Sequence, residues 1–440
     1  MSAAGIHYDH PSLMLTKKAW HTSKTFIYLN KALRIHQTVS NTHPYIPRNS
    51  YFKQVEPYIG SNLIKVLVGQ RRVGKSYILF QLMDEIEKRD PSVQVLYINK
   101  EDYAFDSIKT YSDLIEYVQE QKQENKDIAL FIDEIQDIEE FERALRHFQN
   151  KKEYDLYCTG SNAQLLSGEL ATYLAGRHIQ IRVFSLSYTE FLDFHQLADS
   201  NDSLLKYIKY GGMPHLINLK NEERVYYEYL NNVFNTIVLK DIVMRFNIRN
   251  LSFLNDLIYF LADNTGSIVS AKRISDYLKS QKINLSPKLV LEYLSHLESV
   301  FFIDRVKRAD VVGRKIFEIG DKFFFEDLGL RHALVAYQQK DIHKIIENLI
   351  YHHLKYRQYK VYVGKLDDKE IDFIAEKDGS RTYIQAAYLI QDEATHQREF
   401  GNLLKIADNF RKLVVSMDEV AEGHHLGIEH WSLRKFLTAF

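Results

Sequence analysis

The chain has one cysteine, Cys158, so it cannot form a disulfide within itself. It also has no apolar run of the roughly 20 residues that a membrane-spanning helix needs. Neither sign of charge is in excess, because 57 basic side chains stand against 58 acidic ones. No overall field therefore draws the protein onto nucleic acid or an anionic membrane, and any such contact must be a local patch. These absences predict a soluble, cytoplasmic protein without a membrane partner.

Hydrophobic residues make up 45% of the chain and charged residues 26%, a composition typical of packed soluble domains. A length of 440 residues predicts about three domains. Residues 1–45 differ from the rest, because one acid, Asp9, stands among five basic residues: Lys17, Lys18, Lys24, Lys31 and Arg34. We expect a poorly ordered extension here. A targeting peptide is the alternative, although the continuous apolar core of a secretory signal is missing.

The stretch from Gly69 to Ser76 fits the pattern G-x-x-x-x-G-K-[ST] of a phosphate-binding loop, the P-loop. It follows an apolar run, Leu63–Val68, that is typical of a buried strand. It leads into Tyr77–Lys88, whose apolar residues recur at helical spacing. The glycines let consecutive backbone N–H groups face one phosphate, and the helix directs its positive end there. The alternative is a glycine-rich turn that binds nothing.

In a P-loop the lysine reaches the β- and γ-phosphates and the hydroxyl binds Mg²⁺. Lys75 is therefore a candidate catalytic residue and Ser76 a candidate metal ligand. Two arginines inside the loop are further candidates for phosphate contact. The predicted nucleotide-binding set is Gly69, Gln70, Arg71, Arg72, Val73, Gly74, Lys75, Ser76 and Tyr77.

Apolar runs alternate with helical patterns after the P-loop. Strands are predicted at Val93–Asn99, Ile128–Ile132, Tyr154–Cys158 and Ile179–Phe184, and helices at Tyr111–Glu120, Glu139–Phe148 and Ala163–Ala175. Nearly continuous apolar strands separated by helices indicate an α/β fold, with a parallel sheet covered by helices on both faces. Ligands of such sheets bind at the carboxyl ends of the strands.

Two acids, Asp133 and Glu134, stand at the exit of the predicted strand Ile128–Ile132, which is a Walker B pattern. Asp133 is the candidate Mg²⁺ ligand, and Glu134 is the candidate catalytic group that orients and polarises the attacking water. A solvated strand end is the alternative reading of two adjacent acids. The P-loop earlier in the same series of strands favours the catalytic reading.

Two further catalytic candidates follow. Asn162, with Ser161 as the alternate, comes after a strand and can contact the γ-phosphate or the water; it can equally cap the next helix. Arg177, just before the fifth strand, can supply positive charge to the phosphate, in its own chain or across a subunit boundary. A structural salt bridge is the alternative role of Arg177.

The order of five motifs makes a family resemblance specific: Gly69–Ser76, Ile132–Gln136, Thr159–Asn162, Leu174–Arg177 and Leu186–Phe191. The chain resembles a bacterial and archaeal group of AAA-type (AAA+/STAND-like) P-loop ATPases. In that group a winged-helix-like segment and a C-terminal restriction-endonuclease-like domain of unknown function follow the ATPase domain. The resemblance implies ATP and Mg²⁺ as ligands, and ATP hydrolysis. It alone indicates adenine, because no residue of the sequence identifies the base.

The resemblance and the hydrophobic pattern together divide the chain into the extension at 1–45, a P-loop domain at 46–200, a helical lid at 201–250, a winged-helix-like segment at 251–335 and the C-terminal domain at 336–440. In the fourth segment helices are predicted at Phe253–Ala262, Ala271–Ser280 and Pro287–Val300, with wing strands at Phe301–Val306 and Lys315–Ile319. Basic residues in the 305–315 wing make DNA a candidate partner through phosphate contacts; a protein partner is the alternative. These residues are Arg305, Lys307, Arg308, Arg314 and Lys315.

The C-terminal domain carries only part of a nuclease site. Such sites need a carboxylate on one strand and then a Glu and a Lys two residues apart on the next. Asp372 fits the first position, with Glu347 on a preceding helix, but Gln385 and Ala387 occupy the other two. We therefore expect no nuclease activity, and a binding or self-associating module instead.

The leading hypothesis is a Mg²⁺-dependent ATPase whose nucleotide state controls the C-terminal modules through a hinge at Gly211-Gly212. One alternative is a nucleotide-dependent DNA-binding switch with little turnover. Another is an ATP-binding scaffold that does not catalyse.

Overall fold

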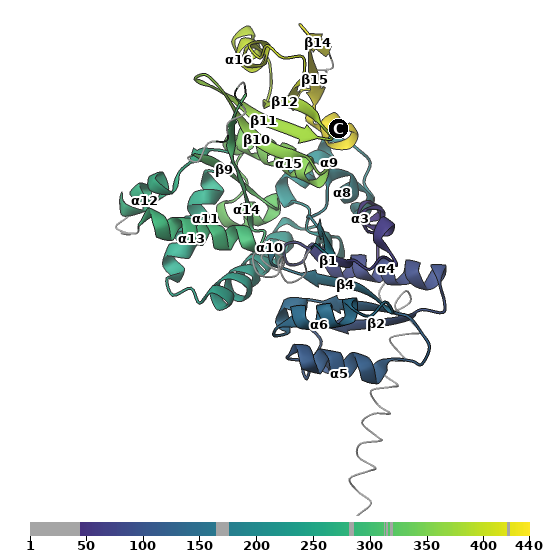
Figure 1. Cartoon of the computed structure of the whole chain (residues 1–440). Coiled ribbons are helices and arrows are strands. Elements are labelled where there is room, and N and C mark those ends of the chain that lie inside the picture. The colour runs from purple at the N-terminus through teal and green to yellow at the C-terminus, as the bar shows by residue number, and fades with distance from the viewer. Residues whose placement is uncertain are drawn as a thin grey trace, which may run out of the picture.

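The structure is a computed structural model, and it describes residues 45–163, 176–280, 286–311, 313, 316, 320–419 and 423–440 (Figure 1). The expected helix at Ala163–Ala175 and the extension before residue 45 therefore lie almost wholly outside the described residues. Among the described helices, none is long and apolar enough to cross a bilayer.

A five-stranded parallel sheet forms the core of the predicted P-loop domain (residues 46–200), called the nucleotide domain below, in the order β2-β3-β4-β1-β5. Its strands are β1 (Ile64–Val68), β2 (Gln94–Asn99), β3 (Ile128–Asp133), β4 (Tyr154–Gly160) and β5 (His178–Arg182). Every residue of β1 and β3 is buried, as expected of strands that are covered on both faces. The α/β fold and the parallel sheet predicted from the sequence are confirmed.

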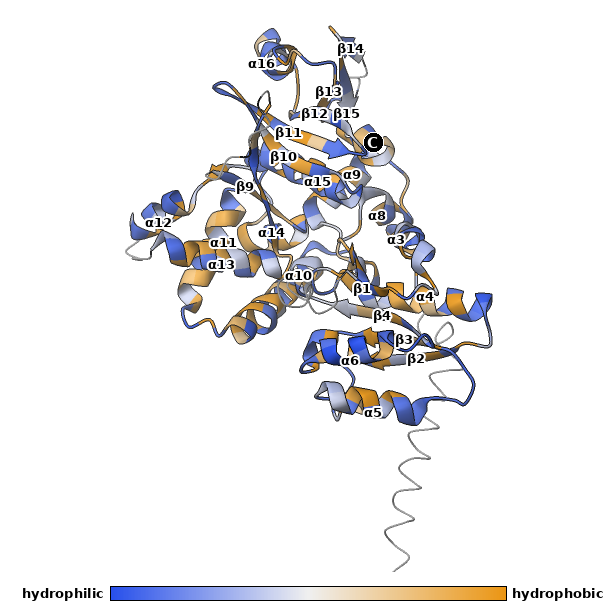
Figure 2. Ribbon diagram, viewed as in Figure 1, coloured by the Kyte–Doolittle hydropathy of each residue, from blue (hydrophilic) through white to orange (hydrophobic). Residues whose placement is uncertain are grey.

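Helices cover both faces of this sheet. Leu67 and Phe131 pack with α4 (Lys75–Arg89) on one face. Val66 and Ile132 point the opposite way and pack with α5 (Tyr111–Gln121) and α6 (Phe141–Gln149) on the other. This division follows from the two-residue period of a strand. Figure 2 shows both polar and apolar residues on α5, which buries only Leu114 and Val118, whereas α4 is buried at every residue from 78 to 84.

Further helical elements come before β1 and after β5. Before β1 come α3 (Asn49–Val55) and η1 (Glu56–Tyr58). After β5 come α8 (Tyr188–His195), α9 (Asn201–Tyr210), the 3₁₀ turn η5 (Pro214–Asn218) and α10 (Glu223–Thr236). The last of these continues directly into a π-helix, η6 (Ile237–Met244).

The next segment combines three helices, α11 (Leu251–Asp263), α12 (Ala271–Ser280) and α13 (Pro287–Ser299), with an antiparallel sheet of three strands in the order β6-β9-β7. The strands are β6 (Ile268–Val269), β7 (Ile303–Val306) and β9 (Asp321–Phe325). The three helices lie where the sequence predicts them. Strand β7 pairs with β9, which comes later in the chain than the expected wing strand Lys315–Ile319. Most of Lys315–Ile319 lies outside the described residues.

The C-terminal part is built on a seven-stranded sheet in the order β14-β15-β13-β12-β11-β10-β8. Helices α15 (Ile342–Tyr356), α16 (Glu393–Leu404) and α17 (Leu433–Ala439) pack on it. Helix α14 (Leu328–Val335) packs with α9, α10 and α11 instead, and the 3₁₀ turn η7 (Gln339–Asp341) comes before α15. The strands are β8 (Arg308–Asp310), β10 (Lys360–Leu366), β11 (Lys369–Lys377), β12 (Ser380–Ala386), β13 (Arg411–Ser416), β14 (Gly423–His425) and β15 (Ile428–Ser432).

The expected segments are joined by shared structure. Strand β8 lies within the expected 251–335 segment, yet it pairs in parallel with β10 of the C-terminal sheet. Helices α8 and α9 contribute Phe191 and Tyr207 to the apolar core formed by α15 and α17. Figure 1 places α8 and α9 beside α15, far from the α5–α6 end of the nucleotide domain.

Candidate nucleotide-binding site

The P-loop connects the carboxyl end of β1 to the first turn of α4, and its glycines are required by the backbone. A Cβ on Gly69 would clash with the carbonyl oxygen of Val183, whose N–H donates to Val68 O at 2.7 Å. Gly74 has a φ of +94°, in the left-handed region that favours glycine. The loop therefore lies tightly between β1 and the chain that leaves β5.

Lys75 directs its ammonium group back into the loop. The side chain is buried, and Nζ donates to Gly69 O at 3.0 Å and to Gln70 O at 3.1 Å. It lies 3.5 Å from Glu134 Oε1. The structure thus brings together the P-loop lysine and the second acid of the Walker B pattern, which are 59 residues apart by their numbers.

The Walker B acids lie at the end of β3, where hydroxyl groups hold them. Thr159 on β4 donates through Oγ1 to Asp133 Oδ1 and accepts from the Glu134 N–H at 2.9 Å. Tyr97 on β2 donates to Asp133 Oδ2 at 3.0 Å. Thr159 belongs to one of the motifs of the sequence but had no assigned role there. No sequence motif pointed to Tyr97.

The two acids differ in pKa. Burial and the neighbouring Glu134 raise the pKa of Asp133, against hydrogen bonds from Ser76 and Thr159. Burial also acts to raise the pKa of Glu134, but the Lys75 ammonium, the Gln136 amide and the Arg71 guanidinium outweigh it and hold this pKa below its ordinary value. Glu134 is therefore a carboxylate at neutral pH and can accept a proton.

Asn162 follows β4 by two residues and lies near the loop, because Gly160 O accepts the N–H of Gly69 at 3.3 Å. Arg177 lies elsewhere. It is exposed at the amino end of β5, where its Nη1 is 3.5 Å from Asn150 Oδ1 and its carbonyl accepts the N–H of Ile64 at the start of β1. The P-loop follows the other end of β1, roughly 16 Å away at about 3.3 Å per residue. The structure does not bring Arg177 to the phosphate site of its own chain.

The two loop arginines have different environments. Arg72 is exposed, with a φ of +72°, and lines the cavity. Arg71 is buried and turns toward Asp241 and Glu101. Gln70 is buried, and its side-chain amide has no hydrogen-bond partner among the residues that the structure describes.

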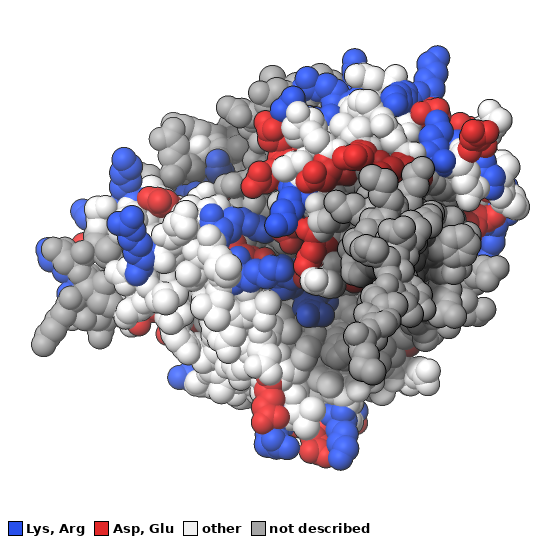
Figure 3. Space-filling model, turned by 90° about the horizontal axis from the view of Figure 1, so that it is seen from below, with Lys and Arg blue, Asp and Glu red and all other residues white. Residues whose placement is uncertain are grey.

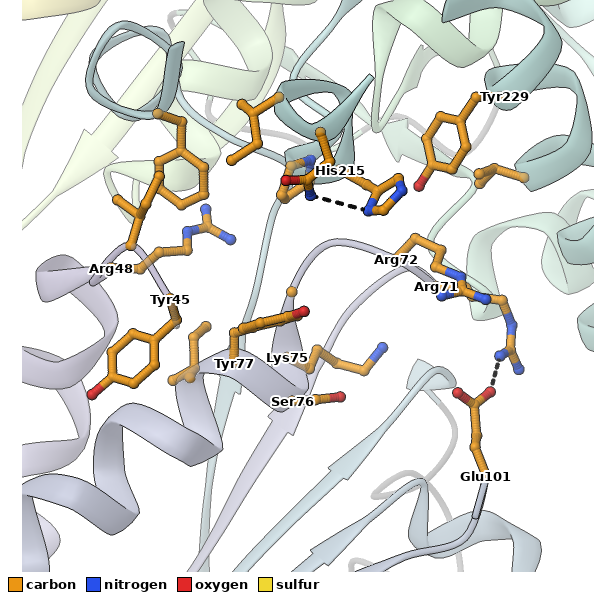
Figure 4. Close-up of a pocket in the computed structure, with 18 of the residues that line it drawn as sticks. Tyr45, Arg48, Arg71, Arg72, Lys75, Ser76, Tyr77, Glu101, His215 and Tyr229 are labelled. Carbon is orange, nitrogen blue, oxygen red and sulfur yellow. Dashed lines mark hydrogen bonds and ion pairs between the residues drawn. The ribbon is translucent and has the colours of Figure 1, made fainter. Parts of the chain in front are cut away.

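A cavity of about 580 Å³ opens above the loop, between the nucleotide domain and the helices that follow it. Figure 4 shows Lys75, Ser76, Arg71 and Arg72 on one side, with His215 and Tyr229 facing them across the gap. The remaining walls include Tyr45, Ile46, Arg48, Phe194, Pro214 and Ile217. These come from segments far from the P-loop in sequence and carry no local motif, so sequence analysis missed them.

The residues present fit a magnesium nucleoside triphosphate. The loop offers backbone N–H groups, an ammonium and the start of a 15-residue helix to an anion. The Ser76 hydroxyl and the Asp133 carboxylate are oxygen ligands of the kind that Mg²⁺ takes. Aromatic and apolar side chains on the opposite wall suit the flat base of a nucleotide.

The predicted C-terminal residues gather around a lysine that the sequence did not single out. Lys322 of β9 is buried, with Nζ 2.6 Å from Glu347 and 2.7 Å from Glu370, and 3.6 Å from Asp372. One ammonium group thus pairs with three acids. In the described part of the chain no group of three or more His, Cys, Asp or Glu side chains could hold a metal ion.

The predicted basic wing and the predicted glycine hinge also make contacts within the protein. In the basic wing, Arg305 pairs with Asp321 at 2.7 Å, and Arg314 and Lys315 lie outside the described residues. The expected hinge is tightly packed, because Gly212 donates to Asp327 Oδ2 at 2.7 Å and a Cβ there would clash with Leu186 O. This pair of glycines is a contact point between segments and not a free hinge.

Comparison with known proteins gives two domain matches. Residues 61–192 match the family model of an AAA domain, and residues 201–341 match a domain of unknown function, DUF8612. An uncharacterized protein of Haemophilus influenzae is 35% identical over 378 residues, covering 84% of this chain and 93% of that protein. An uncharacterized protein of Methanocaldococcus jannaschii is 28% identical over 362 residues, covering 79% of each.

Similarity to solved structures is low. The ORC1 protein of Aeropyrum pernix in complex with DNA matches with a TM-score of 0.32 and 13% identity, over 68% of this chain and 94% of that one. AMPPCP-bound DnaA from Aquifex aeolicus matches with a TM-score of 0.31 and 15% identity, over 59% and 90%. At these scores neither similarity transfers a function to this chain.

Proposed function

Because the chain belongs to the family of the uncharacterized Haemophilus influenzae protein, and its residues 61–192 are an AAA domain, we propose that it binds ATP with Mg²⁺ and hydrolyses it. One observation carries the proposal: Lys75 and Glu134 lie 3.5 Å apart in the wall of a single cavity. An anion-binding ammonium and a proton-accepting carboxylate are the two groups that phosphoryl transfer to water requires at close range.

Each residue has a separate part in this proposal. The P-loop amides and Lys75 hold the phosphates, while Ser76 and Asp133 hold Mg²⁺, which supplies charge neutralisation when bound. Glu134 orients a water molecule and takes its proton. Asn162 contacts the γ-phosphate or this water. Arg177 is too far from the site of its own chain, so we assign it a role only across a boundary between two copies of the protein.

The base is assigned to the cavity walls away from the phosphate loop. Ile46, Phe194 and Ile217 supply apolar surface there, and Tyr45 and His215 supply rings. Adenine is chosen from the family resemblance. The buried position of the single cysteine, Cys158, suits the cytoplasmic location that we also propose.

A DNA partner is the weaker proposal. Arg305 already has a carboxylate partner. Among the wing residues that the structure describes, Lys307 is the exposed basic residue. Figure 3 shows both basic and acidic side chains on the described part of the face seen from below. Control of the C-terminal modules by nucleotide has indirect support, since Val233 of α10 lines the cavity and lies in the same apolar core as Leu254 of α11.

The test uses two variants of the full chain. We expect Glu134→Gln to bind Mg-ATP in calorimetry about as tightly as wild type, and to release phosphate at least about 100-fold more slowly, the usual size of a general-base effect. Lys75→Ala should lose binding. Equal phosphate release by wild type and Glu134→Gln would exclude hydrolysis at this site, and wild-type protein that gives no heat with Mg-ATP would exclude nucleotide binding.

A further inference from the structure

Arg71, inside the P-loop, is joined to a helix 170 residues later in the chain. Its Nε donates to Asp241 Oδ2 at 2.9 Å and its Nη2 to Asp241 Oδ1 at 3.0 Å, a bidentate pair. Nη1 donates to Glu101 Oε1 at 2.5 Å. Arg71 is 6% exposed and Asp241 1%, so water screens this pair little. Bidentate pairing also fixes direction, because both partners are planar.

Asp241 lies on the π-helix η6, which is an uncommon element. Helices with i→i+5 bonds occur mostly as single turns and frequently at functional sites. Here the π-helix spans eight residues, and Ile248 N–H still bonds Val243 O, five residues back. Ile237, Val238 and Ile242 anchor it in the core that also contains Leu79 of α4.

Several charges surround Arg71. Glu101 also lies 3.7 Å from Lys240, and Asp241 lies 3.9 Å from Arg245. Arg71 and Glu134 both line the nucleotide cavity, and the Arg71 charge helps to lower the pKa of that carboxyl. The guanidinium therefore connects the wall of the nucleotide cavity to the acid of the π-helix.

We propose that Arg71 is a positioning residue that couples nucleotide binding to the conformation of residues 237–244. The inference rests on the proposed function. A triphosphate at the loop brings negative charge within reach of Arg71 and competes with Asp241 for its donors. Coupling between two sites is reciprocal. The free energy by which bound nucleotide weakens the Arg71–Asp241 pair therefore equals the free energy by which the pair weakens nucleotide binding. Asp241 thus restrains nucleotide binding, and bound nucleotide loosens the π-helix.

The first experiment uses wild-type protein and amide hydrogen exchange with and without saturating Mg-ATP. Exchange in residues 237–244 should become faster when Mg-ATP binds. Binding itself is established separately by calorimetry. If Mg-ATP binds and exchange in this segment is unchanged or slower, the coupling is wrong while the proposed function stands. If Mg-ATP does not bind, both fall.

The second experiment replaces the acid of the pair. Asp241→Asn keeps the size of the side chain and removes its charge, so Mg-ATP should bind at least about fivefold more tightly, the lower end of usual couplings. Exchange in 237–244 should then be fast and indifferent to nucleotide. Asp276→Asn is the matched control, since Asp276 is an exposed acid on α12, and it should leave both measurements as in wild type.

A purely structural role for the pair predicts a different result. Asp241→Asn would then lower the thermal midpoint while its Mg-ATP affinity stayed within twofold of wild type or fell, and this result would overturn the proposal. If Asp241→Asn does not fold, the exchange experiment on wild type decides alone.

Discussion

Arg48 holds three parts of the nucleotide domain together. Its guanidinium donates to Val73 O in the P-loop at 2.9 Å and to Phe184 O after β5 at 3.0 Å. It also forms a bidentate pair with Glu190 of α8, at 2.9 and 2.7 Å. Arg48 is 3% exposed, so the loss of either partner would leave an uncompensated buried charge. A residue outside every motif thus supports the P-loop through the carbonyl of Val73.

Arg48→Met should therefore lower the free energy of unfolding by about 3–5 kcal/mol, the cost of breaking a buried ion pair from one side. Urea denaturation followed by circular dichroism measures the change. Arg143→Met is the matched control, because Arg143 forms an exposed pair with Glu140 that should contribute less than about 1 kcal/mol. Equal effects of the two substitutions would show that Arg48 has no special role.

Among elements, the close approach of α9 and α14 depends on one glycine. Gly329, in the first turn of α14, lies where any Cβ would clash with the carbonyl oxygen of Tyr210 at the end of α9. Backbone atoms cannot move aside as a flexible side chain does. The two helices can therefore lie this close only with glycine at this position.

Gly329→Ala should lower the thermal midpoint, with a cost of about 1–3 kcal/mol for the extra methyl group. The same change at Gly401 provides the control. Gly401 lies in α16 with open space where a Cβ would be, so alanine there should be neutral or stabilise by up to about 1 kcal/mol. A midpoint for Gly329→Ala equal to that of Gly401→Ala would contradict the packing argument.

Elements of the nucleotide domain were predicted within a few residues because each signal is local. Buried parallel strands are continuous apolar runs, and the P-loop and Walker B patterns are short. The position of Arg177 shows the limit of such reading. Its place just before a parallel strand puts it at the edge opposite the ligand, which the topology implies but the motif does not. Arg48 and Asp241 lacked any signal, because their partners are distant in sequence.

At the scale of the whole molecule, buried histidines make stability depend on pH. His332 is 1% exposed on α14, and its Nδ1 lies 3.1 Å from Lys209 O. Burial, and the nearby Arg331 charge, lower the pKa of His332 from 6.5 to about 3. The folded protein therefore keeps this ring neutral at a pH where the unfolded chain protonates it.

Stability from His332 is complete above about pH 6.5 and is lost as the pH falls toward 3, because only the unfolded state takes up the proton in this window. Between pH 6.5 and 5 the loss is about 2 kcal/mol, at 1.4 kcal/mol per pH unit. His332→Gln should lose less stability than wild type over this range in urea denaturation. His424→Gln, at an exposed position, should follow wild type; a His332→Gln profile parallel to both would refute the assignment.

The pairing of β8 with β10 has a practical consequence for anyone who dissects this protein. A fragment that starts at residue 336 would lack β8. Strand β10 would then be an unpaired edge strand, which can pair with other chains and aggregate. The fragment would also lack Phe191 and Tyr207, so apolar side chains of α15 and α17 that these residues cover would be exposed to solvent. We therefore expect that the C-terminal part does not fold as an independent domain. Expression trials should include β8, α8 and α9 with it.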